Sequence, residues 1–435
     1  MKPLHTLQNE DGIVLVTALI MVVILTVLMT GAYLTTSNEL SISGNYKTAK
    51  QAMYQADAGV NYTIAQVEAG LKNDTLTLPT TAGNSVSLSF ISPPTGYSFS
   101  CLTNLIMDSA NCYRFQVKGN AANNSSSSAT IEVTIKRDAA IKMAAFGDKL
   151  MDMKSSSNFY SYDSTSESPP TNMTESTDLA DVGSNGEVVS KNGTNIDGNV
   201  VLGNDGTDDA TFSDKSGTNL TGTETEVGPI DADPLDVNGA EYAAQFPYYD
   251  ASNDNADVSG LGESINLGNP DPDVTLTSKS GGSNYYFTDI SLGNSKKIFI
   301  DNSAGPVNIY VDGDITFNNG AELNIINPTN PVNIYMTGEF DGKNGNIVNP
   351  GSSTNFALFS STTGTMTLHN SVDFAGLIYS PYADIELKNS AAIYGAIWGS
   401  TITAHNSFTL FYDTALQNKY LSNDVMLSSW RNIRN

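Results

Sequence analysis

The side chains that could carry acid, base, nucleophilic or metal chemistry are few and scattered along the 435-residue sequence. The three histidines, His5, His369 and His405, do not share a spacing typical of a metal site or a catalytic group. Asp208 and Asp209 form an adjacent acidic pair in a loop rich in Gly and Asn. A glycosidase needs two carboxylates that face each other across the substrate, so this pair does not predict catalysis.

Further acidic residues cluster in the middle of the chain, at Asp231, Asp233 and Asp236 and in the run from Asp250 to Asp257. Their oxygens could bind calcium, but their spacing matches neither an EF-hand nor the glycine-rich calcium repeats. We expect no cofactor here. A solvated acidic loop is favoured, and a calcium site stays open as the alternative.

The two cysteines, Cys101 and Cys112, are separated by ten residues in a strand-rich stretch. This spacing suits a local disulfide and does not match a zinc site. An oxidising compartment would form the bridge, whereas a reducing cytosol would leave two free thiols. Because the N-terminal segment described below is typical of an exported protein, we expect the disulfide.

The chain is strongly acidic, with 46 Asp and Glu against 21 Lys and Arg and a formal net charge of −25. Arg114, Arg137, Arg431 and Arg434 are its four arginines. Such a chain lacks the basic surface that binds phosphate backbones, so we exclude nucleic acid as a partner. The length predicts more than one domain, and the abundance of Gly, Asn, Ser, Thr and Asp is typical of turns and short strands.

One long helix must position the N-terminal part of the chain. Residues 13–34 are nearly all apolar, and about 20 apolar residues suffice for a helix to cross a bilayer. A cleaved secretory signal has a shorter apolar region, so we expect this helix to be retained. Beyond the span, apolar residues recur every three or four positions to about Leu71, which predicts a soluble stem. The stem face comprises Ala49, Ala52, Met53, Ala56, Val60, Ile64 and Val67.

Two motifs in this helix resemble those of a known family. The residues from Asn9 to Gly12, followed by the apolar run from Ile13, resemble the leader of type IV prepilins, which prepilin peptidase cuts after the glycine. The sequence QAMYQADAGV, from Gln51 to Val60, looks like the signature Ala-Phe-x-Ala-Ala-Glu-Ala-Gly of PilX-type minor pilins. The resemblance covers roughly residues 1–70.

The resemblance implies a single-pass precursor in the bacterial inner membrane, with its C-terminus outside the cytoplasm, that later joins a fibre at the cell surface. The implied partners are prepilin peptidase, which would cut between Gly12 and Ile13, and other pilins. Two residues depart from the family pattern: Asp11 precedes the glycine where a basic residue is usual, and Thr17 stands at the fifth mature position. Most major pilins have a glutamate there, so Thr17 suits an assembly role at or near the fibre tip.

A small antiparallel sheet is predicted after the helix. The stretches Ser85 to Ile91, Tyr113 to Lys118 and Ala129 to Lys136 alternate in side-chain character, as half-buried strands do. The polar segment from Gly119 to Ser128 is typical of a hairpin loop. This sheet would pack against the stem face, which is the helix-plus-sheet plan of pilins.

A repeat characterises the distal part of the chain. The ten residues from Pro306 recur 25 residues later from Pro331, with six of ten positions identical. In a second register Leu368, Leu387 and Ala404 follow one another at steps of 19 and 17 residues. Units of this length, rich in β-branched and aromatic residues and divided by turns, predict the coils of a parallel β-helix.

We therefore expect an α+β pilin-like module followed by an all-β parallel β-helix (solenoid). Stacked coils would place Ile309 next to Ile334 and Ile378 next to Ile397, with a ladder of asparagine side chains at the turns. A β-sandwich of repeated hairpins is the alternative. The expected parts are a leader at 1–12, a helix at 13–72 with 13–34 in the membrane, a head at 73–140, a β-helix at 141–416 with acidic loops at about 203–275, and a tail at 417–435 that covers open strand edges.

The leading functional hypothesis is assembly into a type IV pilus or a related secretion pseudopilus, with display of the β-helix to an unknown surface ligand. Parallel β-helices also occur in polysaccharide-cleaving enzymes, so an envelope-tethered enzyme is the alternative. No arginine lies between Arg137 and Arg431 to act as the base of a lyase. We therefore expect a structural protein that is not an enzyme.

Replacing Gly12 by valine should block leader removal, because the peptidase requires the small residue before its cut. Mass spectrometry of the N-terminus should find a chain beginning at Ile13 for the natural sequence and the uncut precursor for Gly12→Val. A Gly12→Val protein that still yields a chain beginning at Ile13 would contradict the resemblance to prepilins.

Overall fold

The protein is described here by a computed structural model, in which the chain forms two compact units. Unit 1 comprises Met1–Arg137 and Asp424–Asn435, and unit 2 comprises Asp138–Asn423. Unit 2 is therefore an insertion between two segments of unit 1. The residues that the structure describes are 10–72, 75–109, 111–121, 124–168, 178–204, 210–215, 217–235, 237, 253–258, 262–368, 373–388, 392–405 and 407–433.

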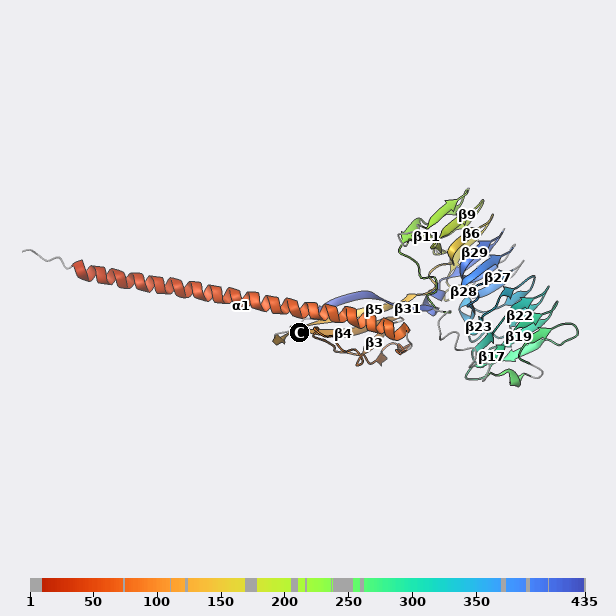
Figure 1. Ribbon diagram of the computed structural model, residues 1–435, viewed down its shortest axis with the longest axis horizontal. Helices are drawn as coiled ribbons and strands as arrows, with labels where there is room; N and C mark the ends of the chain where they lie inside the picture. The colour runs from red at the N-terminus through yellow and green to blue at the C-terminus, as the bar shows by residue number, and fades with distance from the viewer. Residues whose placement is uncertain are drawn as a thin grey trace, which may run out of the picture. The chain divides into compact units, whose positions relative to one another are not determined.

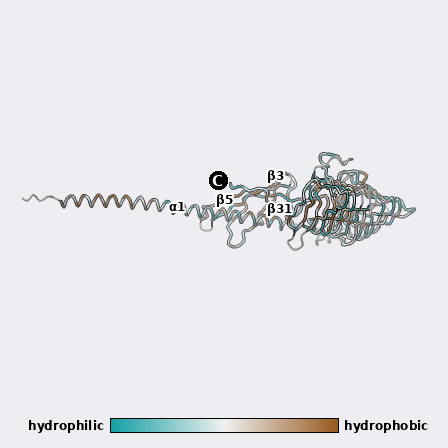
Figure 2. The backbone as a smooth tube through the Cα atoms, turned by 90° about the horizontal axis from the view of Figure 1, so that it is seen from above, coloured by the Kyte–Doolittle hydropathy of each residue, from teal (hydrophilic) through white to brown (hydrophobic). Residues whose placement is uncertain are grey.

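Unit 1 is built on one continuous helix, α1 (Glu10–Lys72) (Figure 1). The helix contains no proline, and residues 14–34 in its N-terminal part are nearly all apolar (Figure 2). Farther along, Ala52, Ala56, Val60 and Val67 are almost fully buried. These four belong to the predicted stem face, so that prediction is confirmed.

The stem face packs on a six-stranded sheet in the order β1-β3-β4-β5-β31, with β2 also paired to β4. The pairs among β1 to β5 are antiparallel, as predicted, and Phe115, Val117 and Val133 fill the core beneath α1. The first predicted strand shrinks to two residues, and β2 and β3 were not predicted. The strands are β1 (Ser85–Val86), β2 (Phe99–Cys101), β3 (Leu105–Ser109), β4 (Cys112–Ala121), β5 (Asn124–Ala139) and β31 (Leu421–Ile433).

Small residues let the helix and the sheet approach closely. A Cβ atom added to Gly119 of β4 would lie 2.1 Å from the backbone nitrogen of Ala56 and 2.4 Å from the carbonyl oxygen of Ala52. A Cβ added to Gly59 would lie 2.6 Å from the Phe99 ring. Ala52, Ala56 and Gly59 of the QAMYQADAGV motif are thus required by packing, because larger side chains would push the sheet away.

The C-terminal segment differs from the expected tail. Residues from Leu421 to Ile433 form β31, which pairs with β5 in the sheet of unit 1, and Val425 joins the core of that unit. The segment therefore completes the head and does not cap the β-helix. The head also reaches beyond the predicted range of 73–140, because one of its strands comes from the C-terminus.

Unit 2 is a stack of coils whose strands are paired in parallel (Figure 1). This confirms the predicted fold class, a long N-terminal helix followed by a large, mostly β domain with parallel strands, and the β-sandwich alternative is wrong. The first group of strands is β6 (Ala145–Met153), β7 (Asn158–Tyr162), β8 (Val182–Ser184), β9 (Glu187–Ser190), β10 (Asn195–Ile196), β11 (Val200–Gly203), β12 (Thr211–Asp214), β13 (Asn219–Leu220) and β14 (Glu224–Val227).

The second group occupies the rest of unit 2. It comprises η1 (Asn255–Asp257), β15 (Ile265–Leu267), β16 (Val274–Thr277), β17 (Ser283–Phe287), β18 (Ile290–Leu292), β19 (Lys297–Asp301), β20 (Val307–Val311), β21 (Ile315–Phe317), β22 (Glu322–Ile325), β23 (Val332–Met336), β24 (Phe340–Asp341), β25 (Asn346–Val348), η2 (Ser353–Asn355), β26 (Phe356–Ser360), β27 (Thr365–Leu368), β28 (Asp373–Leu387), β29 (Ala392–Ala404), β30 (Thr409–Asp413) and α3 (Leu416–Lys419).

The repeats stack in the predicted register. Ile309 pairs with Ile334, and Ile378 pairs with Ile397, all inside the core. The second register is also confirmed, since Leu368 pairs with Leu387 and Leu387 with Ala404.

Asparagine ladders connect neighbouring coils. At the turns the Asn344 amide donates to the Asn319 side-chain oxygen at 2.7 Å, as predicted. A second ladder was not predicted and runs along strands, where the Asn333 amide donates to Asn308 at 3.1 Å and the Asn308 amide donates to Asn284 at 3.0 Å. Each step ties one coil to the next at a polar position.

The order of the coils does not follow the order of the chain. Along one face the strands pair in the sequence β14, β11, β8, β6, β29, β28, β26, β23, β20 and β17. The chain thus enters the stack in its middle at β6 and builds outward to β14. It then crosses to the opposite end and builds inward from β15 to β30, which pairs with β7.

Aromatic residues mark the junction between the two groups of strands. Successive coils in strand register carry Tyr286, Tyr310, Tyr335, Phe359, Tyr379, Trp398 and Phe146. The Trp398 and Phe146 rings lie 4.3 Å apart between centroids, and these residues come from β29 and β6. The Trp398 indole therefore connects the second group of strands, at β29, to the first group, at β6.

Replacing Trp398 by alanine should lower the free energy of unfolding of unit 2 by about 3–5 kcal/mol, the usual cost of removing a buried aromatic side chain. Urea unfolding followed by circular dichroism would measure the change. The matched control is Trp430→Ala, because Trp430 is 53% exposed and lies in unit 1. A loss below about 1 kcal/mol for Trp398→Ala would show that the junction of β29 with β6 does not hold the stack together.

Candidate functional site

The N-terminal part of α1 has the properties of a membrane span. From Val14 its most apolar stretch has a mean hydropathy of 2.7 and no buried residue. The hydroxyls of Thr26 and Thr30 donate to the carbonyl oxygens four residues earlier, both at 2.7 Å. Such bonds satisfy the polar groups within the helix, as an apolar environment requires.

The predicted processing and assembly residues lie at the start of α1. Gly12 and Ile13 are both within the helix, which begins at Glu10. Thr17 is exposed one turn later. The structure places these residues on one apolar helix, and cleavage between Gly12 and Ile13 stays a prediction.

The predicted disulfide is wrong, because the strand register separates the two cysteines. Cys101 on β2 pairs with Val117 of β4, and Cys112 lies five residues from Val117 along that strand. Five residues of a strand span roughly 17 Å, whereas bridged cysteines have Cα atoms no more than about 7 Å apart. Both cysteines are free. Burial raises the pKa of the Cys101 thiol, and a contact with the Thr63 hydroxyl at 3.5 Å opposes this effect.

A network of charged residues on the head was not predicted. Glu132 of β5 is 6% exposed and accepts hydrogen bonds from Arg431 at 2.8 Å, Gln116 at 2.8 Å and Arg114 at 3.3 Å. Arg114 also binds both carboxylate oxygens of Asp108, at 2.8 and 3.0 Å. The bond from Gln116, followed by that from Arg431, lowers the pKa of Glu132. The rarity of arginine was the available signal, since two of the four arginines in the sequence converge here.

The acidic residues of the middle segment have structural roles where the structure describes them. Asp233 accepts hydrogen bonds from the hydroxyls of Tyr379 at 2.7 Å and Tyr382 at 2.9 Å. Burial, followed by the charge of Asp233, raises the pKa of Tyr379. The neighbouring Ala232 carbonyl accepts from the Trp398 indole at 2.7 Å. The crossover segment, Ile230–Leu235, thus covers the aromatic row at the junction of the coils.

A second acidic group caps one end of the stack. The amide of Asn255 donates to the Tyr286 carbonyl at 2.6 Å, and its oxygen accepts from the Tyr286 nitrogen at 3.1 Å. Asp254 likewise accepts from the Asn284 nitrogen at 2.8 Å and from Lys279 at 2.7 Å. These side chains occupy the open edge of β17, so part of the acidic insert covers a strand edge.

The described residues contain no group of three or more His, Cys, Asp and Glu side chains that could hold a metal ion. Asp231 lies on the crossover segment and Asp257 in η1, whereas Asp208, Asp209, Asp236, Asp250, His5 and His369 lie outside the described residues. The structure therefore does not describe the adjacent carboxylate pair, Asp208 and Asp209, that was considered for the enzyme alternative.

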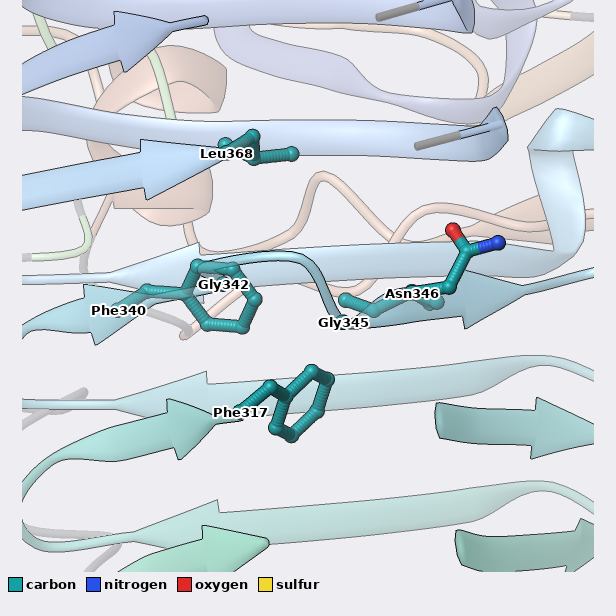
Figure 3. Close-up of a pocket in the computed structure, with 7 residues that line it drawn as sticks. Phe317, Phe340, Gly342, Gly345, Asn346 and Leu368 are labelled. Atoms are coloured by element: carbon teal, nitrogen blue, oxygen red, sulfur yellow. The ribbon is translucent and has the colours of Figure 1, made fainter. Parts of the chain in front are cut away.

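A space between neighbouring coils is too small for a ligand. It lies between Phe317, Phe340 and Leu368 in the core of unit 2 and has a volume of about 10 Å³ (Figure 3). Such a space admits at most a single water molecule. The core of the coil stack is thus packed.

Comparison with known proteins identifies two segments. Residues 11–61 match the model of the PilX N-terminal family, and residues 242–419 match a domain of unknown function, DUF7305. The first segment contains Gly12 and Ile13, between which cleavage is predicted, and most of the stem face. The N-terminal segment of the chain is therefore similar to that of PilX-type minor pilins. The second segment covers the strands from β15 to β30. A search of curated proteins found no match to the chain.

Similar solved structures include a pilin and two ice-binding proteins. The competence-associated pilin ComZ from Thermus thermophilus is 13% identical, with 89% of this chain and 97% of ComZ covered and a TM-score of 0.29. An ice binding protein from an Antarctic Biological Consortium is 11% identical, covering 64% and 91% of the two chains with a TM-score of 0.26. An ice-binding protein from Antarctomyces psychrotrophicus is 12% identical, covering 62% and 95% with a TM-score of 0.24.

Both cysteines of the chain should be free thiols, because the register of β2 on β4 keeps them apart. Alkylation of the exported protein without reduction, followed by peptide mass spectrometry, should find Cys101 and Cys112 each carrying the label. A linked peptide pair containing both residues would show that the register of β2 is wrong.

Proposed function

We propose that this PilX-type pilin is a minor subunit that displays its coil stack at the end of a type IV pilus or related fibre. The observation that carries the proposal is the insertion of unit 2 between β5 and β31. Helix α1 and the sheet share a core of their own. The pilin module therefore keeps every element that assembly needs, whatever the insertion contains.

Assembly would proceed through the exposed apolar surface of α1. Before assembly this surface lies in the inner membrane, and after cleavage by prepilin peptidase it packs against the helices of other pilins. Large apolar residues continue to be exposed beyond the span, with Leu40 69%, Ile42 68% and Tyr46 69% exposed. Exposed apolar side chains at several positions around this part of the helix favour contacts with other subunits.

Two features support a place at the fibre tip. Thr17 cannot neutralise the N-terminal amine of a neighbour, whereas the glutamate of major pilins offsets the cost of such a charge in an apolar environment. A subunit without this carboxylate adds poorly to an existing fibre but can begin one. In addition, the insertion Asp138–Asn423 is larger than the pilin module itself, and copies on every subunit of a packed rod would collide.

The coil stack presents surfaces suited to adhesion. All four residues of β14, the outermost strand of its ladder, are exposed, and they include Glu224, Thr225 and Glu226. Outward positions on other coils carry hydroxyl and carboxylate groups, such as Thr401 bonded to Asp384 at 2.6 Å. Polar groups in fixed rows can bind a repetitive surface through many weak contacts.

Antibodies against unit 2 should label fibres at one end, with few copies per fibre. Electron microscopy with gold-labelled antibodies would test this, with an antibody against the major subunit as the control that labels the whole shaft. Deleting residues 138–423 should keep the pilin module in fibres but reduce adhesion. Even labelling along the shaft, or a Thr17→Glu variant that becomes the dominant subunit without a packing defect, would contradict a place at the tip.

A further inference from the structure

The outer surface of the head contains an open pocket of about 420 Å³. Its lining includes Asp108 of β3, Arg114 of β4, Thr134 of β5 and Trp430 of β31. The volume falls within the range of about 300–1,000 Å³ that is usual for small-molecule sites. Strands from both ends of unit 1 thus contribute to one concave surface.

Trp430 gives this pocket an exposed aromatic wall. The indole is 53% exposed, whereas the other tryptophan of the chain, Trp398, is 2% exposed. Tryptophan is enriched at binding surfaces, because its large apolar ring gains stability when a ligand or partner covers it. The apolar C–H face of a pyranose ring is a suitable cover, because it stacks on an indole while its hydroxyls point to the sides.

The polar groups around the ring match sugar hydroxyls. Asp108 and Arg114 are each 37% exposed at the side chain, and Arg431 is 74% exposed. Glu132 is saturated by its donors, so its role is to hold the two guanidinium groups in place. The Asp108 carboxylate can then accept, and the Arg431 guanidinium can donate, a hydrogen bond to neighbouring hydroxyls.

The charges favour a neutral ligand. Two arginines and two carboxylates meet in the pocket, and they balance one another. A chain with a net charge of −25 also repels polyanions at long range. We propose that this pocket binds a neutral pyranose unit of a glycan, stacked on Trp430 and hydrogen-bonded to Asp108 and Arg431. This site lies in the pilin head and is independent of the adhesive role proposed for the coil stack.

Tryptophan fluorescence tests the proposal directly, because Trp430 should dominate the quenching by acrylamide. Neutral oligosaccharides of hexopyranoses, added to the full chain in detergent, should protect the emission from quenching and shift it to shorter wavelength. The Trp430→Phe variant should lose this response. In a parallel binding assay with the same sugars, Trp430→Ala and Asp108→Asn should each weaken binding by roughly tenfold or more.

The control is Tyr97→Ala, which removes another exposed aromatic residue of unit 1 and should leave sugar binding unchanged. Circular dichroism would establish that each variant is folded. The proposal is overturned if neutral sugars at millimolar concentration do not protect Trp430. It is also overturned if only uronic acids or amino sugars do so, or if Trp430→Ala binds neutral glycans as well as the natural protein.

Discussion

The pairing of β5 with β31 is the constraint on which the remaining architecture depends. These two neighbouring strands are the ends of the insertion, so unit 2 must begin and finish side by side. Within unit 2 this is met, since the Ala140 nitrogen donates to the Tyr420 carbonyl at 2.9 Å. A stack built from one end to the other would separate its first and last strands by roughly 40 Å, at about 4.8 Å for each strand. The chain avoids this separation by entering the stack in its middle, building outward, crossing over and building inward.

This path creates a junction between β29 and β6, which are not successive repeats in the sequence. Large aromatic side chains stabilise this junction. Elsewhere one coil follows the next along the chain, so stacking closes short loops. At the junction β29 pairs with β6, which is about 250 residues away, and closing such a loop costs more conformational entropy. Trp398, Phe146 and Tyr379 bury extensive aromatic surface at this point. The crossover segment must pass along the stack in any case, and its Asp233 carboxylate binds Tyr379 and Tyr382 as it does so.

These long-range relations explain which features the sequence could predict. The helix, its stem face and the coil register follow from local periodicity, so Ile309 and Ile334 could be paired from their spacing alone. The disulfide failed because a short spacing in sequence says nothing about strand register, and β2 and β3 carried no clear alternation. The strand β31 was not predicted because its residues do not alternate between apolar and polar. Arg431, one of only four arginines in the sequence, was the one signal that this segment has a role. The pocket at Trp430 draws on strands from both ends of the chain, and no local pattern connects them.

Helix α1 shows why an insertion at this position is compatible with a pilin. Residues 14–34 of the helix are nearly all apolar, as a lipid or helical-bundle environment requires. Its C-terminal half has small residues on one face because Gly119 and Phe99 approach it closely. Neither requirement involves the connection between β5 and β31. Residues inserted there leave the helix and its packing unchanged, provided that their two ends return to neighbouring strands. The same chain can therefore keep a pilin-like helix-and-sheet module intact and carry a separately folded unit between two of its strands.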